Sequence, residues 1–143
     1  MRMINTLIIH CADTYARMDI GVPEIDQWHR ARGWNGCGYH FVIRRSGQIE
    51  KGRPVATAGA HAKNHNAESI GICMVGGKGD DNRPADNFMP EQWTALKALV
   101  LEMHEEYPIE SIIGHRDVEP SKTCPNFDVA GWLHLYLPGL GHP

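Results

Sequence analysis

The sequence predicts a single α/β domain in which helices flank a central mixed β-sheet. Strand-like and helix-like segments alternate in the order β-α-β-β-loop-β-α-β-α, which is typical of a sheet covered by helices and not of a sandwich or a bundle. A chain of 143 residues, 42% of them hydrophobic, is long enough to build one full core. No internal repeat or linker divides the sequence, so we expect one domain over residues 1–143.

The first half of the chain begins with a strand and a helix. Residues 4–10 form a short apolar run with β-branched residues, which predicts a buried strand ending at His10. Residues 22–32 carry apolar side chains at helical spacing, with a proline in the first turn and a glycine just beyond the end. Residues 38–52 alternate, turn at a glycine and resume, which predicts a β-hairpin.

The second half continues the alternation. The continuous apolar run 69–75 is typical of a strand buried on both faces. Residues 90–107 place large apolar side chains on one stripe and give the clearest helix. A short strand is expected over 110–115, ending at His115, and a last helix over 128–137.

Two segments lack any period and are expected to be loops. Residues 55–66 are rich in Gly, Ala, His and Asn, and a loop of this length is often functional. Residues 76–87 contain several Gly and Asp residues and a Pro, which predicts a mobile surface loop.

Charge and hydropathy exclude several classes of partner. The formal net charge is −3, without the basic excess of a protein that neutralises nucleic-acid phosphates. The longest apolar stretch near the start, residues 7–9, is far too short for a membrane span or a signal-peptide core. We therefore expect no nucleic-acid partner, no membrane partner and no export signal. Four cysteines without close pairing are expected to be free thiols.

Three residues could be metal ligands. His10 and His115 each end a predicted strand, and parallel strands bring their carboxyl ends to one rim of a sheet. Cys124 follows His115 by nine positions. Two His and one Cys suit a catalytic zinc ion that keeps its fourth position open, and Lys122 could supply a positive charge to an oxyanion beside it.

Each of these residues also has a simpler interpretation. A histidine at the end of a strand is often a hydrogen-bonded structural residue, and a lone cysteine is often an inert buried thiol. Tyr39, in the first strand of the hairpin, could be an aromatic core residue with its hydroxyl at the rim. Spacing alone leaves these alternatives open.

Seven segments resemble the successive signatures of the type 2 N-acetylmuramoyl-L-alanine amidases. The resemblance is greatest to the small phage lysozymes (endolysins) of the T-odd coliphage kind, and peptidoglycan-recognition proteins are more distant. It covers about residues 4–133. The segments are Ile9-His10-Cys11-Ala12, Gly38-Tyr39-His40-Phe41-Val42-Ile43, Gly59-Ala60-His61-Ala62-Lys63, Ser69-Ile70-Gly71-Ile72, Phe88-Met89-Pro90-Glu91-Gln92, Gly114-His115-Arg116-Asp117 and Lys122-Thr123-Cys124-Pro125.

The resemblance implies a function and a role for each matching residue. His10, His115 and Cys124 would bind one catalytic Zn²⁺ at the C-terminal rim of the strands. The reaction implied is hydrolysis of the amide between the lactyl group of N-acetylmuramic acid and L-alanine in peptidoglycan. Tyr39 and Lys122 would be catalytic and would meet the charge of the tetrahedral oxygen.

Two roles stay open at this point. The sequence contains no His-Glu-x-x-His motif, so the proton acceptor is unassigned and Tyr39 is the first candidate. His61, in the long loop, matches a family position that lines the substrate groove and could bind substrate. Alternatively, it is a loop histidine held by backbone hydrogen bonds. The remaining histidines are expected to serve packing or to face solvent, namely His29, His40, His65, His104, His134 and His142.

The sequence departs from its phage relatives at two places. Those relatives usually carry several residues before the first strand, which help them bind phage RNA polymerase, whereas strand-like sequence begins here by Ile4. This difference counts against polymerase binding. Where the family tends to place Thr before the proline of the long helix, this chain has Met89, which cannot accept a capping hydrogen bond.

We expect a phage or prophage endolysin that waits in the host cytoplasm and acts on the periplasmic cell wall after release. The alternative is a non-catalytic peptidoglycan-binding or polymerase-regulating module, but the thiolate ligand whose loss is usual in such relatives is present as Cys124. An antibacterial effector or a recycling amidase would share the same site. Nothing in the composition requires a dimer, so a monomer is expected.

Overall fold

The computed structural model describes residues 2–140. The expected domain bounds at residues 1 and 143, and the expectation for His142, lie outside the described residues. The strands are β1 (Thr6–Cys11), β2 (Thr14–Tyr15), β3 (Phe41–Ile43), β4 (Ile49–Lys51), β5 (Ser69–Met74), β6 (Gly77–Lys78) and β7 (Ser111–Gly114). The helices are α1 (Val22–Ala31), α2 (Pro90–Glu106), α3 (His115–Val118) and α4 (Val129–Tyr136).

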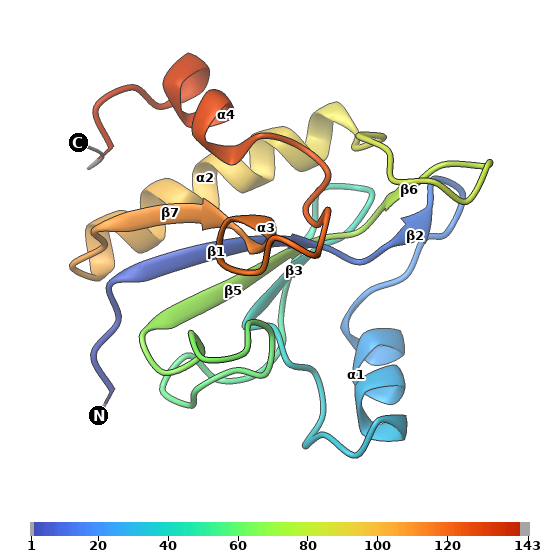
Figure 1. Cartoon of the computed structure of the whole chain (residues 1–143), viewed down its shortest axis with the longest axis horizontal. Coiled ribbons are helices and arrows are strands. Elements are labelled where there is room, and N and C mark those ends of the chain that lie inside the picture. Colours follow the sequence, from blue (N-terminus) through green and yellow to red (C-terminus); the bar gives the residue numbers. More distant parts are fainter. Residues whose placement is uncertain (1, 141–143) are drawn as a thin grey trace.

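A mixed five-stranded sheet forms the centre of the molecule, as the sequence predicts (Figure 1). Its strand order is β4-β3-β5-β1-β7. β3, β5, β1 and β7 pair in parallel, and only the edge strand β4 is antiparallel to its neighbour β3. The first strand of the chain therefore lies between β5 and β7, which places its carboxyl end beside theirs.

The two faces of the sheet are packed differently. Alternate residues of β1 and β5, among them Leu7, Ile9, Ile70 and Ile72, belong to the larger core cluster, which α2 and α4 cover. Figure 1 shows α2 and α4 together on one side of the sheet and α1 apart from them. Ile25 of α1 packs in a smaller cluster, whose members also include Cys37, Val42, Cys73 and Val75. The smaller cluster leaves room on its face for polar side chains.

The first turn of α2 is tied to the sheet by Gln92, whose side chain is fully buried. Its Nε2 donates hydrogen bonds to the carbonyl oxygens of Val75 (2.8 Å) and Ile43 (3.2 Å). Its Oε1 accepts from the backbone N–H of Met89 (2.9 Å) and from Arg45 (3.0 Å). One amide thus satisfies backbone groups of the helix and of the sheet.

Three details differ from the sequence-based expectations. β1 continues to Cys11, and β7 ends at Gly114, so that His115 is the first residue of α3. The segment 76–87 is not a simple loop, because β6 within it pairs with β2 and Ala85 N–H donates to Gly77 O (2.9 Å). Backbone pairing orders a segment whose composition alone is typical of a loop. No helix among residues 2–140 is both long and apolar enough to cross a membrane.

Candidate active site and metal centre

His10 and His115 meet at the carboxyl ends of neighbouring parallel strands. β1 and β7 are in register with Ile9 opposite Gly114, and the residue that follows each of these two in the chain is a histidine. Their ring centroids lie 4.6 Å apart. His10 is 1% exposed, and His115 is partly exposed at the start of α3. The sheet register alone therefore brings together two residues that are far apart in the sequence.

Cys124 completes the cluster from the loop after α3. Its carbonyl oxygen accepts a hydrogen bond from the backbone N–H of Arg116 (2.8 Å), which holds the loop against the helix. Its Sγ lies 3.9 Å from Nδ1 of His10 and accepts a hydrogen bond from the backbone N–H of Cys11 (3.1 Å). One ligand atom from each of His10, His115 and Cys124 lies within 4.8 Å of the others.

This donor set fits a zinc ion. Ligand atoms about 2.0 Å (nitrogen) and 2.3 Å (sulfur) from a tetrahedral zinc lie roughly 3.5 Å apart, close to the observed separation of His10 and Cys124. Burial, together with His61 and His115, lowers the pKa of His10 well below its usual value, and burial also lowers the pKa of His115. Both rings are thus neutral near pH 7, as metal ligation requires.

Each histidine of the cluster has a hydrogen-bond partner on its other side. His10 Nε2 lies 2.8 Å from His61 Nδ1. His115 Nε2 lies 2.8 Å from a carboxylate oxygen of Glu119, one turn further along the chain. Such outer partners orient ligand imidazoles. Sequence reasoning missed Glu119, although its spacing of four residues from His115 is the signal for one helix face.

Tyr39 stands beside the cluster with its ring centroid 5.0 Å from that of His10. Burial raises the pKa of its phenol well above the usual value, and the neighbouring thiols add to this. The phenol therefore keeps its proton at neutral pH and is a hydrogen-bond donor there. This favours stabilisation of a negative oxygen over the role of proton acceptor for which the sequence made it the first candidate.

A groove of about 470 Å³ opens onto the cluster. His10, Tyr39, His61, His115 and Lys122 all line it, so the structure brings the predicted residues of the site together at one opening. Lys122 is exposed at the groove, and Cys124 lies behind it in contact with His10. Sequence reasoning did not identify several further lining residues, namely Arg32, Trp34, Ala60, Ala62, Lys63 and Asn66.

His29 is both a buried packing residue and part of the groove wall, and the sequence indicated only the first of these. It is buried, and its Nδ1 accepts a hydrogen bond from Gly38 N–H (2.8 Å), as a packing role requires. It also lines the groove, with its ring centroid 4.6 Å from that of Trp34. Helix α1 thereby contributes one wall of the groove.

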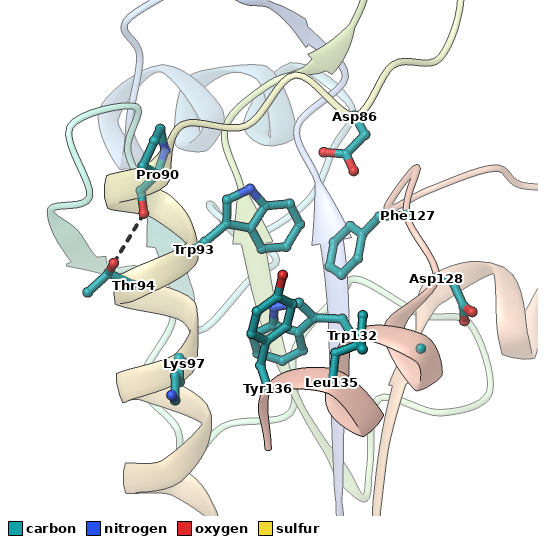
Figure 2. Close-up of a pocket in the computed structure, with 11 residues that line it drawn as sticks. Asp86, Pro90, Trp93, Thr94, Lys97, Phe127, Asp128, Trp132, Leu135 and Tyr136 are labelled. Carbon is teal, nitrogen blue, oxygen red and sulfur yellow. Dashed lines mark hydrogen bonds between the residues drawn. The ribbon is translucent and has the colours of Figure 1, made fainter. Parts of the chain in front are cut away.

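A second, larger groove of about 780 Å³ lies between α2 and α4 and contains none of the predicted site residues (Figure 2). Figure 2 shows the rings of Trp93, Phe127, Trp132 and Tyr136 gathered along it. Carboxylates line it too, but none of its lining side chains is a histidine or a cysteine. The larger volume favours this groove, whereas the predicted site residues line the smaller one.

Comparisons with known proteins agree with the geometry. A family model described as N-acetylmuramoyl-L-alanine amidase matches residues 1–127. The chain is 46% identical over 129 residues to the endolysin of Enterobacteria phage K11, covering 90% of this chain and 85% of that protein. It is 40% identical over 128 residues to the endolysin of Escherichia phage T7, covering 90% and 84%.

More distant matches point the same way. Peptidoglycan-recognition protein SC2 of Drosophila melanogaster is 35% identical over 112 residues, covering 76% of this chain and 58% of that protein. Among solved structures, the N-acetylmuramoyl-L-alanine amidase LysC from Clostridium intestinale superposes with a TM-score of 0.78 at 32% identity, covering 92% of this chain and 84% of that chain. The chain belongs to the N-acetylmuramoyl-L-alanine amidase family, enzymes that act on peptidoglycan.

Proposed function

We propose that this amidase is a zinc enzyme that cleaves the bond between the lactyl group of N-acetylmuramic acid and L-alanine. One Zn²⁺ would be held by His10, His115 and Cys124. The observation that carries the proposal is the convergence of two imidazoles and a cysteine sulfur, whose ligand atoms lie within 4.8 Å of one another beside an open groove. When bound in such a site, zinc polarises a carbonyl oxygen and lowers the pKa of water, which makes amide hydrolysis feasible at neutral pH.

The protein's own residues would bind the substrate and stabilise the transition state. Tyr39 Oη holds its proton and would donate a hydrogen bond to the oxygen of the lactyl carbonyl as negative charge develops on it. The Nζ of Lys122, at the exposed side of the same groove, would place a positive charge near that oxygen. Both groups act more strongly on the charged transition state than on the neutral amide, which is the requirement for catalysis.

His61 would not bind substrate through its ring nitrogens. It lines the groove, but it is 8% exposed and both ring nitrogens already have partners, His10 at 2.8 Å and Ser69 Oγ at 3.2 Å. Its backbone N–H is also occupied, by Oδ1 of Asn66 (3.0 Å). The ring is therefore better suited to hold His10 than to contact the glycan.

The biological role we propose is that of an endolysin, acting on the wall after release from the host cytoplasm. The similarity to two phage endolysins over about nine-tenths of the chain supports this role. We further propose that the protein acts as a monomer, since one chain supplies the three candidate ligands together with Tyr39 and Lys122.

Digestion of purified peptidoglycan tests the proposal. The protein is compared with and without zinc, and the soluble products are analysed by mass spectrometry. Free stem peptides with an L-alanine amino terminus, released only with metal, are the expected result. Release without metal would overturn the role of zinc, and muropeptides that keep the lactyl amide would overturn the bond assignment. Binding without any release would favour the alternative of a non-catalytic recognition module.

A further inference from the structure

We infer that His61 and Ser69 form a hydrogen-bonded relay that fixes the ring of His10 in the tautomer able to bind metal. In this relay, Ser69 acts on His61 and His61 acts on His10, so both are positioning residues. The inference rests on the proposed zinc function and assigns roles to side chains that lie outside the ligand set.

The direction of each hydrogen bond in the relay follows from the bond that Ser69 makes to the backbone of His65. Ser69 Oγ lies 2.6 Å from the carbonyl oxygen of His65, and only the hydroxyl can donate in that pair. With its proton committed there, Ser69 Oγ must accept from His61, whose Nε2 is 3.2 Å away. The proton of the neutral His61 ring therefore sits on Nε2.

The same reasoning carries the proton assignment to His10. A neutral His61 ring with its proton on Nε2 has a lone pair on Nδ1, and this atom lies 2.8 Å from His10 Nε2. His10 Nε2 must then carry the proton and donate. The lone pair of His10 is left on Nδ1, which is the atom that faces Cys124 Sγ at 3.9 Å. A serine at the start of β5 thus determines which nitrogen of His10 is free for metal.

The packing around the relay leaves its members little freedom. His10, His61 and Ser69 are all buried. The His61 ring lies flat against Gly71, where an added Cβ would come within 2.6 Å of ring carbon atoms. Oδ1 of Asn66 accepts hydrogen bonds from the backbone N–H groups of His61 (3.0 Å) and Ala62 (2.9 Å), which anchors the loop that carries the ring. Packing and backbone hydrogen bonds therefore hold the ring of His61 in place beside His10.

Residues 69–74 show why β5 can hold this ring. Ser69, Gly71 and Cys73 alternate with Ile70, Ile72 and Met74, so one face of the strand carries small side chains and the other large ones. The large side chains belong to the core under α2 and α4. The small ones leave the space that the His61 ring fills.

Two measurements on Ser69→Ala test the relay. In the metal-free wild type, ¹⁵N chemical shifts of the His10 ring should show a protonated Nε2 and an unprotonated Nδ1. Ser69→Ala removes the acceptor for His61 Nε2–H, so His61 can move its proton to Nδ1 and force that of His10 onto its own Nδ1. We expect a mixture of His10 tautomers and about a 10-fold loss of zinc affinity in chelator competition. Thr6→Val is the matched control, because Thr6 of β1 lies opposite Ser69 of β5 and, within residues 2–140, its hydroxyl hydrogen-bonds only to the side chain of Asn5.

A second pair of variants separates hydrogen bonding from packing. His61→Asn keeps an oxygen acceptor near the position of Nδ1, whereas His61→Leu has nearly the same shape without it. We expect His61→Leu to lose zinc affinity by at least about 10-fold and His61→Asn to stay within about 3-fold of the wild type. Equal affinities of the two variants would overturn the relay.

The outcomes distinguish the relay from the function on which it rests. A wild-type His10 with its proton on Nδ1, or unchanged zinc affinity in Ser69→Ala, would overturn the relay and leave the zinc amidase intact. A wild type that binds no zinc but shows the expected His10 tautomer would overturn the proposed function and leave the hydrogen-bond assignment in place.

Discussion

At the scale of single residues, the site separates side chains that would hold metal from those that would stabilise charge. Cys124 would be the sulfur ligand, and its Sγ contacts both His10 and the backbone of Cys11. Lys122 lies only two positions away but is exposed at the groove. The loop after α3 would thus supply both a metal ligand, Cys124, and a charge-stabilising group, Lys122. Substitutions of these two residues should affect zinc binding and turnover separately.

We expect Cys124→Ser to lose zinc, because a serine hydroxyl is a far poorer ligand than a thiolate. Its affinity for zinc, measured by competition with a chromogenic chelator, should fall by at least about 100-fold, and amidase activity should fall with it. Cys37→Ser is the control, since Cys37 is buried at the backbone of Tyr39 and outside the cluster. Full zinc binding by Cys124→Ser would remove Cys124 from the ligand set.

Lys122→Ala should retain zinc and lose turnover. Removing one group that stabilises an oxyanion lowers kcat by roughly 100-fold. The comparison is steady-state release of stem peptide alongside metal content, with Lys97→Ala on α2 as a matched loss of one lysine far from the site. Unchanged kcat would assign charge stabilisation to other groups, and loss of zinc would make Lys122 structural.

At the scale of elements, the start of α2 shows how a weak cap is compensated. Met89 occupies the N-cap position without a side-chain capping bond, as its sequence predicts. Gln92 accepts from the N–H of Met89 and donates to two carbonyl oxygens of the sheet region. The start of α2 therefore lacks the side-chain capping bond of the N-cap residue. The hydrogen bonds of the buried Gln92 side chain hold it in place instead.

Met89→Thr should stabilise the protein by about 1 kcal/mol, because a threonine hydroxyl at the N-cap can accept a hydrogen bond from the first turn. Met89 is 39% exposed, so little core packing is lost. Urea denaturation measures the difference. Met3→Thr, at a 79% exposed position outside any helix or strand, is the control and should change stability little. A destabilised Met89→Thr would show that the side chain of Met89 contributes more through packing than a cap supplies.

Several elements followed from the sequence because their cause is local. The stripe of large apolar residues in 90–107 and the β-branched run near the start correspond to α2 and β1. β2 and β6 could not be predicted, since each has two residues and their pairing is made by backbone groups. The seven signatures indicated the candidate ligands His10, His115 and Cys124. The position of the His61 ring beside His10 could not be predicted, because it depends on packing against Gly71, which no local pattern reports.

At the scale of the whole molecule, buried neutral histidines couple folding to pH. Burial lowers the pKa of His29 and of His40 from 6.5 to about 4. Positive charges lower these pKa values further, from Arg32 and Arg53 at His29 and from Arg2 and Arg53 at His40, whereas Asp26 and the backbone of Thr57 act in the opposite direction. The unfolded chain protonates these histidines below about pH 6.5, whereas the folded chain resists until about pH 4. The contribution of these two histidines to the free energy of unfolding is therefore fully present above about pH 6.5. It decreases as the pH falls from 6.5 to about 4.

The free energy of unfolding of the metal-free protein should decrease steadily between pH 6.5 and 4. His40→Gln should flatten this dependence by up to about 1.4 kcal/mol per pH unit, the limit for one proton. Urea denaturation at several pH values measures the slope. His134→Gln, on the exposed side of α4, should leave the slope as it is in the wild type. A His40→Gln slope equal to that of the wild type would show that His40 does not take part.

The cluster joins residues that lie far apart in the sequence. His10 and Cys124 are 114 positions apart, so their contact closes a long loop of the chain. During synthesis, His10 emerges from the ribosome about a hundred residues before Cys124. A chain that has not been synthesised as far as Cys124 therefore lacks one member of the proposed ligand set, and metal uptake would report the fraction of chains that extend past Cys124 and have folded.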